Sequence, residues 1–459
     1  MILQVAIFVS HLLCCSIAQE SLHESVVSNP QNARKMKSNS HVFMESIPHL
    51  NRRSDIQKID RMTSDFIHEV TFVIKQRNMR ELTIFLDDVS DPASVNYGKH
   101  MTKEEVANLT SNPTARDATM SYLTSSGATI VEETLNGEYV TANASISVWE
   151  RMLNTRFFMF HLSENNNIIK KVVRAESYSI PIGLQLYVDG TFNTIQMPPQ
   201  YFGNYGTLIP EEVETEEMTL TATSSMTPAT LKRFYNVGNA QGSASSTQAI
   251  FAAIEQYFSP ADLFSFLRDA GLPQQKVVKV VGGHSSDSVC VKNPESCAEA
   301  NLDVQYIMAA STASPTTFWY TDQSWSGWLR SVANTPKPPL VFSISYGQEE
   351  SFVSRAEKDA FSREAIKLGA MGVTIVAASG DDGAISRAVR IDGVSACSYV
   401  AIFPASNPYV TAVGATSVSA VKFTLHDIVQ HFFVASFHSE SSCDKFKLLC
   451  GCRILLIDV

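Results

Sequence analysis

Short apolar runs in the second half of the chain constrain its fold more than any other feature of the sequence. These runs cover residues 248–256, 276–281, 339–345 and 373–378. Helical patterns lie between them, at residues 261–271, 296–310 and 354–369. Strands that are apolar on both faces and alternate with helices are typical of a parallel sheet with helices on both sides. The sequence therefore predicts an α/β fold, in which chemistry gathers at the carboxyl ends of the strands.

Length and charge narrow the class of protein. A chain of 459 residues, 44% of them hydrophobic, has enough apolar material for two or three globular domains. The formal net charge is −10, and no basic stripe is visible. Nucleic acid is therefore not expected as a main partner.

The N-terminus predicts entry into the secretory pathway. Residues 2–17 are almost wholly apolar, and the small residues Ser16 and Ala18 precede Gln19. This pattern is typical of a signal peptide of residues 1–18, although a basic n-region is missing. No other apolar run reaches the ~20 residues that a membrane span needs, so no membrane span is expected. We expect a lysosomal, vacuolar or extracellular location.

The chain before the apolar runs divides into segments of different composition. Residues 19–64 are polar and are predicted to form a loose leader. Residues 65–197 alternate strand and helix patterns and are predicted to fold as a separate α+β domain, which also holds glycosylation motifs at Asn108 and Asn143. Residues 198–226 combine Pro, Gly and a dense run of Glu, and are predicted to be a linker.

Two acids in the predicted helix of residues 296–310 need an explanation. Glu299 and Asp303 are four residues apart, so a helix places both carboxylates on one face. A pair at this spacing is more often a solvated acidic face than a site. The apolar residues around this pair, however, predict a buried helix, in which an unpaired carboxylate is costly. The pair is therefore a candidate functional site.

A third acid follows the last apolar run. In Ser379-Gly-Asp381-Asp-Gly383, the glycines on either side predict a tight turn that directs Asp381 into a cleft. Taken alone, such a turn is usually structural. Its place after a buried strand favours a functional role.

The cysteines favour a disulfide rather than a metal site. Cys290 and Cys297 are spaced so that they could close a small loop just before the acidic helix, and an oxidising compartment permits that bond. The other cysteines outside the predicted signal peptide are Cys397, Cys443, Cys450 and Cys452. They lack a His partner or paired C-x-x-C spacing, so zinc is not expected. They also cluster too late in the chain for a disulfide scaffold, which makes a cysteine-rich binding protein a weaker hypothesis.

Several motifs resemble one known family. They read Glu299-Ala-Asn-Leu-Asp-Val-Gln-Tyr306, Ser343-Ile-Ser-Tyr-Gly347, Ser379-Gly-Asp-Asp-Gly383, Phe403-Pro-Ala-Ser-Asn-Pro-Tyr-Val-Thr-Ala-Val-Gly414 and, in the first domain, Asp91-Pro92 followed by Tyr97-Gly-Lys-His100. On these motifs the chain resembles the sedolisins, or serine-carboxyl peptidases, from about residue 65 to residue 416. The resemblance implies a subtilisin-like doubly wound parallel sheet in residues 227–418. It also implies an activation pro-domain in residues 65–197 that is cleaved off within residues 198–226.

The resemblance implies a role for each acid. Glu299 matches the general base that takes a proton from a nucleophilic serine, and Asp303 matches the acid that orients this base. Asp381 matches the oxyanion-hole acid, which must be protonated to donate a hydrogen bond. Two neighbouring carboxyls that share protons leave one of them ionised at acidic pH. The family also implies a Ca²⁺ ion, with ligands near the C-terminus that match no residue of this sequence.

The nucleophile has no match. The family carries it in Ser-Gly-Thr-Ser-Ala-Ser, a motif that does not occur in the sequence. Ser417 lies in a similar context but directly follows a strand motif, Ser379 is a turn residue of the family, and Ser345 matches no nucleophile. Residues 419–459 fit the family poorly, so the resemblance implies a peptidase domain that stops before its nucleophile.

Two hypotheses from different classes follow. The first is a serine-carboxyl peptidase zymogen that hydrolyses peptides or unfolded proteins at acidic pH, with this chain inactive as given. The alternative is a catalytically dead, secreted homologue that acts as a binding or chaperone-like protein. The sequence leaves open whether the enzyme would trim tripeptides from free N-termini or cut internal bonds.

Overall fold

The structure is a computed structural model of the chain, and it describes residues 41–47, 53, 55–164, 167–198, 227–381 and 400–414. All of these residues belong to one compact unit. The predicted signal peptide, the linker from residue 199, Ser417, the four later cysteines and the tail of residues 419–459 lie outside the described residues, as does most of the predicted leader.

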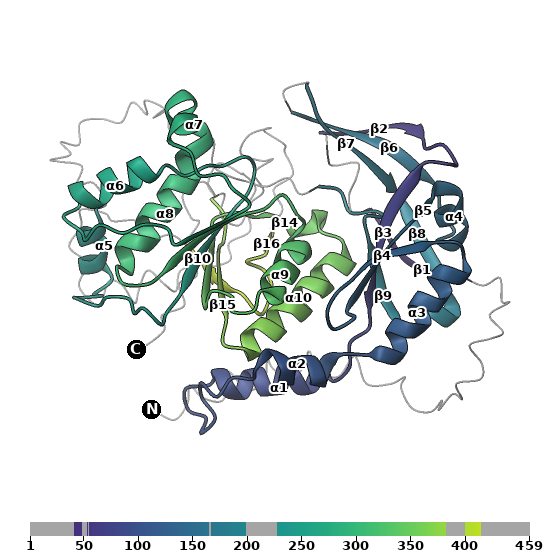
Figure 1. Ribbon diagram of the computed structural model, residues 1–459, viewed down its shortest axis with the longest axis horizontal. Coiled ribbons are helices and arrows are strands. Elements are labelled where there is room, and N and C mark those ends of the chain that lie inside the picture. Colours follow the sequence, from purple (N-terminus) through teal and green to yellow (C-terminus); the bar gives the residue numbers. More distant parts are fainter. Residues whose placement is uncertain are drawn as a thin grey trace, which may run out of the picture. The chain divides into compact units, whose positions relative to one another are not determined.

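A six-stranded parallel sheet forms the centre of residues 227–414 (Figure 1), as the apolar runs predict. Its strands, in spatial order, are β11 (Lys279–Val281), β12 (Thr316–Tyr320), β10 (Gln248–Ala252), β13 (Val341–Ile344), β15 (Thr374–Ala378) and β17 (Thr411–Val413). The register pairs Ile250 of β10 with Phe318 of β12 and with Ser343 of β13. Because all neighbours are parallel, the carboxyl ends of the strands meet at one edge.

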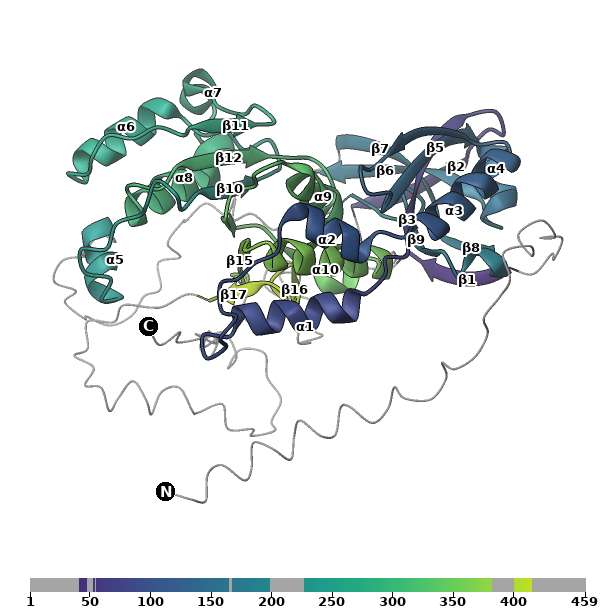
Figure 2. The ribbon, with the colours of Figure 1, turned by 60° about the horizontal axis from the view of Figure 1, so that its bottom comes forward.

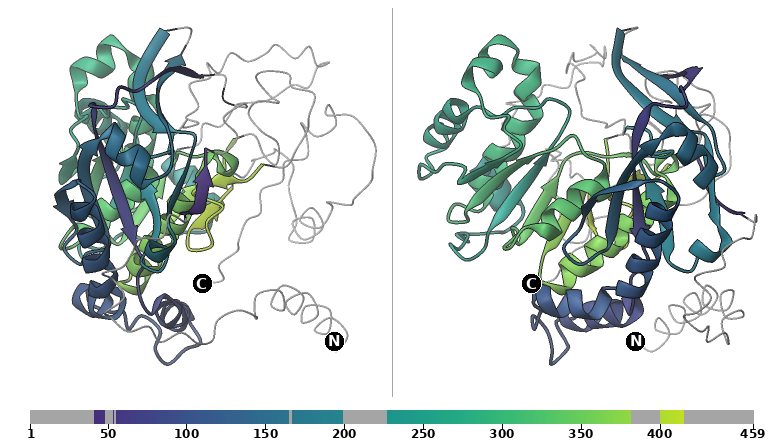
Figure 3. Two further views of the ribbon diagram at one scale, coloured as in Figure 1. Left: turned by 90° about the vertical axis from the view of Figure 1, so that its right-hand side faces the viewer. Right: turned by 45° about the vertical axis from the view of Figure 1, so that its right-hand side comes forward.

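Helices cover both faces of this sheet (Figure 3). Successive residues of β10 point to opposite faces. Ile250 and Ala252 pack under α6 (Pro260–Asp269) and α8 (Ala298–Ala310). Ala249 and Phe251 pack under α9 (Trp325–Asn334) and α10 (Arg355–Ala370). The sheet is therefore doubly wound, and its strands are apolar on both faces because both faces are covered.

Residues 41–198 form a mixed α+β part with smaller antiparallel sheets. Its strands are β1 (His41–Ser46), β2 (Ile56–Arg61), β3 (Ile67–Ile74), β4 (Thr129–Glu133), β5 (Tyr139–Ser145), β6 (Phe157–Glu164), β7 (Asn167–Ala175), β8 (Ser177–Pro181) and β9 (Val188–Phe192), in the sheets β4-β5-β3-β9, β2-β6-β7 and β1-β8. Its helices are α1 (Met79–Ser90), α2 (Lys103–Thr110), α3 (Pro113–Ser125) and α4 (Ile146–Met152). Trp149 and Phe72 lie in its core.

This part packs on the parallel-sheet part through α1 and α2, which lie beside α10 (Figure 2). Leu82 of α1 and Val106 of α2 form one apolar cluster with Ile366 and Ala370 of α10. The shorter elements among the described residues are α5 (Pro228–Phe234), α7 (Asp287–Lys292), β14 (Gln348–Glu349), β16 (Ile402–Phe403) and the 3-10 turns at Ile182–Leu184, Pro294–Cys297 and Glu350–Phe352.

The structure corrects one expectation about the acidic helix. The sequence predicts a helix buried around its whole circumference, yet Leu302 is 51% exposed. Only Ala300, Val304, Met308 and Ala309 of α8 are fully buried. The helix therefore covers the sheet with one face, and an apolar residue such as Leu302 on the other face does not imply burial.

Candidate active site

Helix α8 is anchored at its first turn by a side chain from a distant loop. Its own N-cap, Cys297, makes no capping hydrogen bond through its side chain. Instead Oε1 of Gln256, which follows β10, accepts from the backbone N–H groups of Glu299 and Ala300 at 3.2 and 3.5 Å. These N–H groups would otherwise lack partners at the helix end. A disulfide joins Cys290 to Cys297, which the sequence allows without deciding the pairing, and it precedes this turn.

A second polar contact fixes the rotation of α8. Nδ2 of Asn301 donates to Asp262 at 2.9 Å, and its Oδ1 accepts from the backbone N–H of Ser259 at 2.8 Å. Both partners belong to the start of α6. Because Asn301 is held on the α6 side, the acids at positions 299 and 303 are turned toward the carboxyl end of β13.

Asp303 meets a serine from the sheet. Ser345, the residue directly after β13, donates its hydroxyl to Oδ1 of Asp303 at 2.5 Å. The other oxygen, Oδ2, is buried and has no hydrogen-bond partner among the described residues. A buried carboxylate oxygen without a partner is costly, which favours the neutral form of the group.

The environment raises the pKa of both acids on α8. Burial raises the pKa of Asp303 well above its usual range, the nearby Glu299 raises it further, and the hydrogen bond from Ser345 opposes the shift. Burial also raises the pKa of Glu299, as does the negative charge of Asp381, while a hydrogen bond with Ser345 again lowers it. The pair therefore holds a proton to higher pH than free carboxyls do.

Asp381 reaches the same place from the next strand. It follows β15 in a turn where Gly380 has φ +95°, a conformation that favours glycine. The backbone N–H of Ser379 donates to Val413 of β17 at 2.9 Å, which holds the start of the turn to the sheet. The Asp381 side chain is exposed, and its charge acts on Glu299. The structure thus brings together all three acids singled out in the sequence.

Sequence reasoning missed two residues of this site, Gln256 and Ser345. Gln256 stands at the end of the apolar run of residues 248–256, where the pattern shows a strand and not a cap. Ser345 ends the next buried strand, the same position that drew attention to Asp381. That placement at the end of a buried strand is the signal that the sequence offers for Ser345.

The described residues offer no place for a metal ion. Within the part of the chain that the structure describes, no three His, Cys, Asp or Glu side chains gather in a way that could bind one. The Ca²⁺ that the resemblance implies therefore finds no such set of three ligands in this part of the chain. In the same part of the chain, none of the helices combines the length and apolar character that crossing a bilayer requires.

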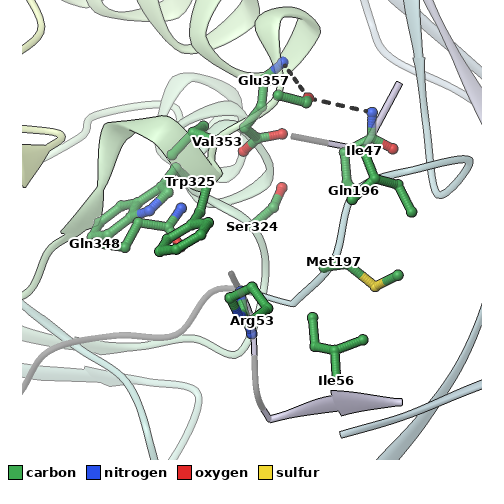
Figure 4. Close-up of a pocket in the computed structure, with 12 residues that line it drawn as sticks. Ile47, Arg53, Ile56, Gln196, Met197, Ser324, Trp325, Gln348, Val353 and Glu357 are labelled. Carbon is green, nitrogen blue, oxygen red and sulfur yellow. Dashed lines mark hydrogen bonds between the residues drawn. The ribbon is translucent and has the colours of Figure 1, made fainter. Parts of the chain in front are cut away.

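A small cavity lies apart from these acids (Figure 4). Its volume is about 30 Å³, and it lies between Ile47, Arg53 and Met197 on one side and Trp325 on the other. At its wall, Nε2 of Gln196 donates to the Ser354 hydroxyl at 3.4 Å. The cavity has room for about one or two water molecules. The cavity lies where residues 41–198 meet the start of α10, and none of the three acids lines it.

Known proteins are similar in sequence to most of this chain. Tripeptidyl-peptidase 1 of Homo sapiens is 30% identical over 377 residues, which cover 79% of this chain and 64% of that protein. Tripeptidyl-peptidase 1 of Mus musculus is 31% identical over 365 residues, which cover 76% and 61%. Residues 54–197 match the family model described as "Pro-kumamolisin, activation domain".

Residues 54–197 are thus similar to activation domains of the pro-kumamolisin type, and most of the chain is similar to tripeptidyl-peptidase 1. The chain spans less than two thirds of the length of the relatives named above. A solved structure of Pseudomonas sedolisin (serine-carboxyl proteinase) complexed with pseudo-iodotyrostatin aligns with 41% of this chain and 52% of that one, at 21% identity and a TM-score of 0.32. That likeness is too low to carry an argument.

Proposed function

We propose that this chain is the zymogen of a serine-type peptidase that hydrolyses peptide bonds at acidic pH. The observation that carries the proposal is the meeting of Glu299, Asp303 and Asp381 at the carboxyl edge of the parallel sheet, with the pKa of both acids on α8 raised. Supporting it, the relatives are named as peptidases. The substrate class is a peptide or an unfolded protein.

Each acid has one task in this proposal. Glu299 is the general base that removes the proton of an attacking serine hydroxyl, a task worth roughly 10²–10⁴ in rate. Asp303 orients Glu299 and shares its proton. Asp381, in its acid form, donates a hydrogen bond to the developing oxyanion, a role typically worth about 10²–10³ in kcat. A carboxylate base suits acidic pH, where a histidine in its place would already be protonated.

The serine itself has no assigned position. Ser-Gly-Thr-Ser-Ala-Ser, the nucleophile motif that the family resemblance supplies, is missing from the 459 residues. We therefore expect these residues to hydrolyse no peptide by themselves. In the same proposal, residues 65–197 are the activation domain, residues 198–226 hold the cleavage point, and the protein travels the secretory pathway to a lysosomal, vacuolar or extracellular location.

The missing motif is also the observation that favours a second candidate, a catalytically dead homologue that binds unfolded proteins. The two candidates differ in the transcript beyond codon 418. A transcript that continues in frame and encodes Ser-Gly-Thr-Ser-Ala-Ser supports the peptidase. Transcripts that all encode residues 419–459 followed by a stop codon support the binding protein.

Activity of the product of such a transcript tests the roles directly. Glu299→Gln keeps the size of the side chain and removes the base, so turnover of a peptide at pH 3–5 should fall by at least roughly 10²-fold. Asp381→Asn keeps a hydrogen-bond donor at every pH, so the acid dependence of its turnover should be weaker than in the wild type. Appreciable turnover in Glu299→Gln, or an unchanged pH profile in Asp381→Asn, contradicts the assigned role. Asp269→Asn, which changes an exposed acid of α6 in the peptidase part, is the matched control.

A further inference from the structure

Residues that follow β10 and β11 and the last residue of β12 meet at the ring of one histidine, His284. This ring stacks on the ring of Tyr320 with 3.4 Å between the ring centres and 13° between the planes. The ring of Tyr257, from the segment after β10, lies 4.3 Å from it. His284 is also the only histidine in residues 227–414 of the sequence. It is therefore the one side chain of this part whose ordinary charge change falls between about pH 5 and pH 8.

Both ring nitrogens of His284 face an acceptor. Nδ1 lies 2.9 Å from the carbonyl oxygen of Gly282, and Nε2 lies 3.4 Å from Oε2 of Glu255. A neutral imidazole has one N–H group and can donate to one of these oxygens, whereas the charged ring donates to both. A positive ring is also attracted by the face of a tyrosine such as Tyr320. The contacts of the structure therefore fit the charged form of His284.

The titratable groups around this ring come from two neighbouring segments. Glu255 and Tyr257 follow β10, and Tyr320 ends β12 and donates its hydroxyl to Oε1 of Glu255 at 3.2 Å. Asp322, two residues beyond β12, adds a negative charge near Tyr320. The acids thus surround His284 with negative charge. Because the side chain of Glu255 is 78% exposed, its contact with His284 is partly screened by water and has a modest strength.

The contact holds a turn that leads directly to the acidic helix. Glu255 has φ +52°, a left-handed conformation that costs free energy in a residue with a side chain, so that contacts must hold it. The next residue, Gln256, is 1% exposed and accepts from the backbone N–H of Glu299 at 3.2 Å. Its Nε2 donates to the carbonyl oxygen of Glu295 at 3.0 Å, just before the helix. Residues 255 and 256 thus join His284 to the first turn of α8.

We propose that His284 is a positioning residue whose charged ring latches the turn at residues 254–256, and through it the first turn of α8, in acid. A histidine is mostly charged at about pH 5 and mostly neutral at about pH 7.5. As the pH rises, the ring loses the proton that bonds Glu255, and the turn opens more often. Glu299 is then held less firmly. This inference rests on the proposed function, because it names a regulation of the base of that reaction.

Amide hydrogen exchange of the full chain tests this latch without substrate. Exchange is measured from about pH 5 to about pH 7.5, corrected for the intrinsic effect of pH, at Glu299 and at Phe258, whose N–H donates to the carbonyl oxygen of His284. In the wild type, the protection of both amides should fall by about two- to fivefold over this range, as expected for a contact between exposed charged groups. Ile250 of the buried strand β10 reports opening of the whole unit and should keep its protection.

Two variants at position 284 should remove the pH dependence in opposite ways. Arg stays charged and its planar group stacks on aromatic rings, so His284→Arg should be as protected at pH 7.5 as the wild type is at pH 5. His284→Gln and Glu255→Gln should be weakly protected at every pH. Since φ of His284 is +65°, both variants at this position bear the same backbone strain. His161→Gln, in β6 of the other part, is the control and should behave as the wild type.

Several results would overturn the latch. One is a wild type whose protection does not change with pH, or changes equally at Ile250. Another is a pH dependence that survives in His284→Gln, or equal protection of the Arg and Gln variants. If Phe258 follows the pH and Glu299 does not, His284 holds its own segment but does not position the acidic helix.

The proposed peptidase activity is judged separately from this exchange. A pH-dependent protection of Glu299 that His284→Gln abolishes supports the latch even if the extended chain hydrolyses no peptide. An active extended chain in which the protection of Glu299 is the same at every pH overturns the latch and leaves the peptidase proposal standing.

Discussion

Two groups of buried acids in this molecule are built in opposite ways. In the first, Glu138 of residues 41–198 and Glu364 of α10 share Lys367, whose Nζ lies 3.3 Å from Glu138 and 2.9 Å from Glu364. All three side chains are at most 7% exposed. Tyr139 donates a further hydrogen bond to Glu364 at 3.0 Å. In the second, Glu299 and Asp303 have a serine hydroxyl in place of a cation.

The difference appears in the pKa values. Burial alone raises the pKa of Glu138, but Lys367 and several hydrogen bonds outweigh it, so that the pKa is lowered. Burial raises the pKa of Glu299 and of Asp303, and no cation among the described residues opposes it. In the first group, Glu138 is thus held ionised, and its contact with Lys367 ties two parts of the chain together. The second keeps a proton, which a structural contact does not need and a proton-transfer site does.

The largest effect should come from removing the cation of the first group. Lys367→Met leaves two acids buried without their partner, and we expect the free energy of unfolding at pH 7 to fall by about 3–5 kcal/mol. Lys358→Met is the control, because Lys358 pairs with Glu350 at 3.3 Å in a partly exposed position, where such pairs are worth about 0–1 kcal/mol. Urea unfolding measures both. Equal losses in the two variants would show that the buried triad is not special.

A smaller effect of opposite sign should follow from neutralising the second group. Asp303→Asn removes a group whose pKa is raised in the folded state from its usual 3.8. The native acid destabilises the fold once the pH rises above that value, because the folded state then keeps a proton that the unfolded state has lost. We expect the variant to be more stable than the wild type at pH 7, because it has no carboxyl group to hold a proton there. The gain should disappear as the pH falls below about 4.

Glu138→Gln should change stability in the opposite direction to Asp303→Asn. Its pKa is lowered from 4.5 in the folded state, so its contribution to stability is present above that pH and is lost as the pH falls through the folded value. The variant should therefore be less stable than the wild type at pH 7 and closer to it in acid. Unfolding curves recorded from pH 3 to pH 7 compare the two variants. If the difference in unfolding free energy between variant and wild type changes with pH in the same direction for both variants, the two groups do not differ as described.

The sequence predicts much of the fold around these two groups but not the contact made by Ser345. Apolar runs predict the parallel sheet because strands covered on both faces have no polar face to display. Residues 77–88, which fit a helix or a strand, form most of α1, and the pattern near Thr102 correctly predicts α2 with its cap. The helices α3 and α9 are not predicted from the sequence. Pro113 lies at the start of α3 and Gly327 lies within α9, and both residue types usually mark loops.

The site is predictable only as far as it follows helical spacing. Glu299 and Asp303 share a face because they are four residues apart, and this holds for any helix. The partner Ser345 is more than forty positions from Asp303 in the sequence. Its contact depends on how α8 lies over β13, which is decided by packing at Ala300 and Val304. The sequence has no local signal for such a contact.

The smallest effect should distinguish a distant cap from a local one. Gln256→Ala removes the acceptor for the first N–H groups of α8, and Thr102→Ala removes the capping box of α2. Each should cost ~1 kcal/mol of stability. Only Gln256→Ala should speed hydrogen exchange at the amides of Glu299 and Ala300, by roughly fivefold for that free energy. If exchange there is equally fast in Thr102→Ala, the first turn of α8 opens with the whole unit. The acid pair would then rest on the stability of that unit and not on the contact with Gln256.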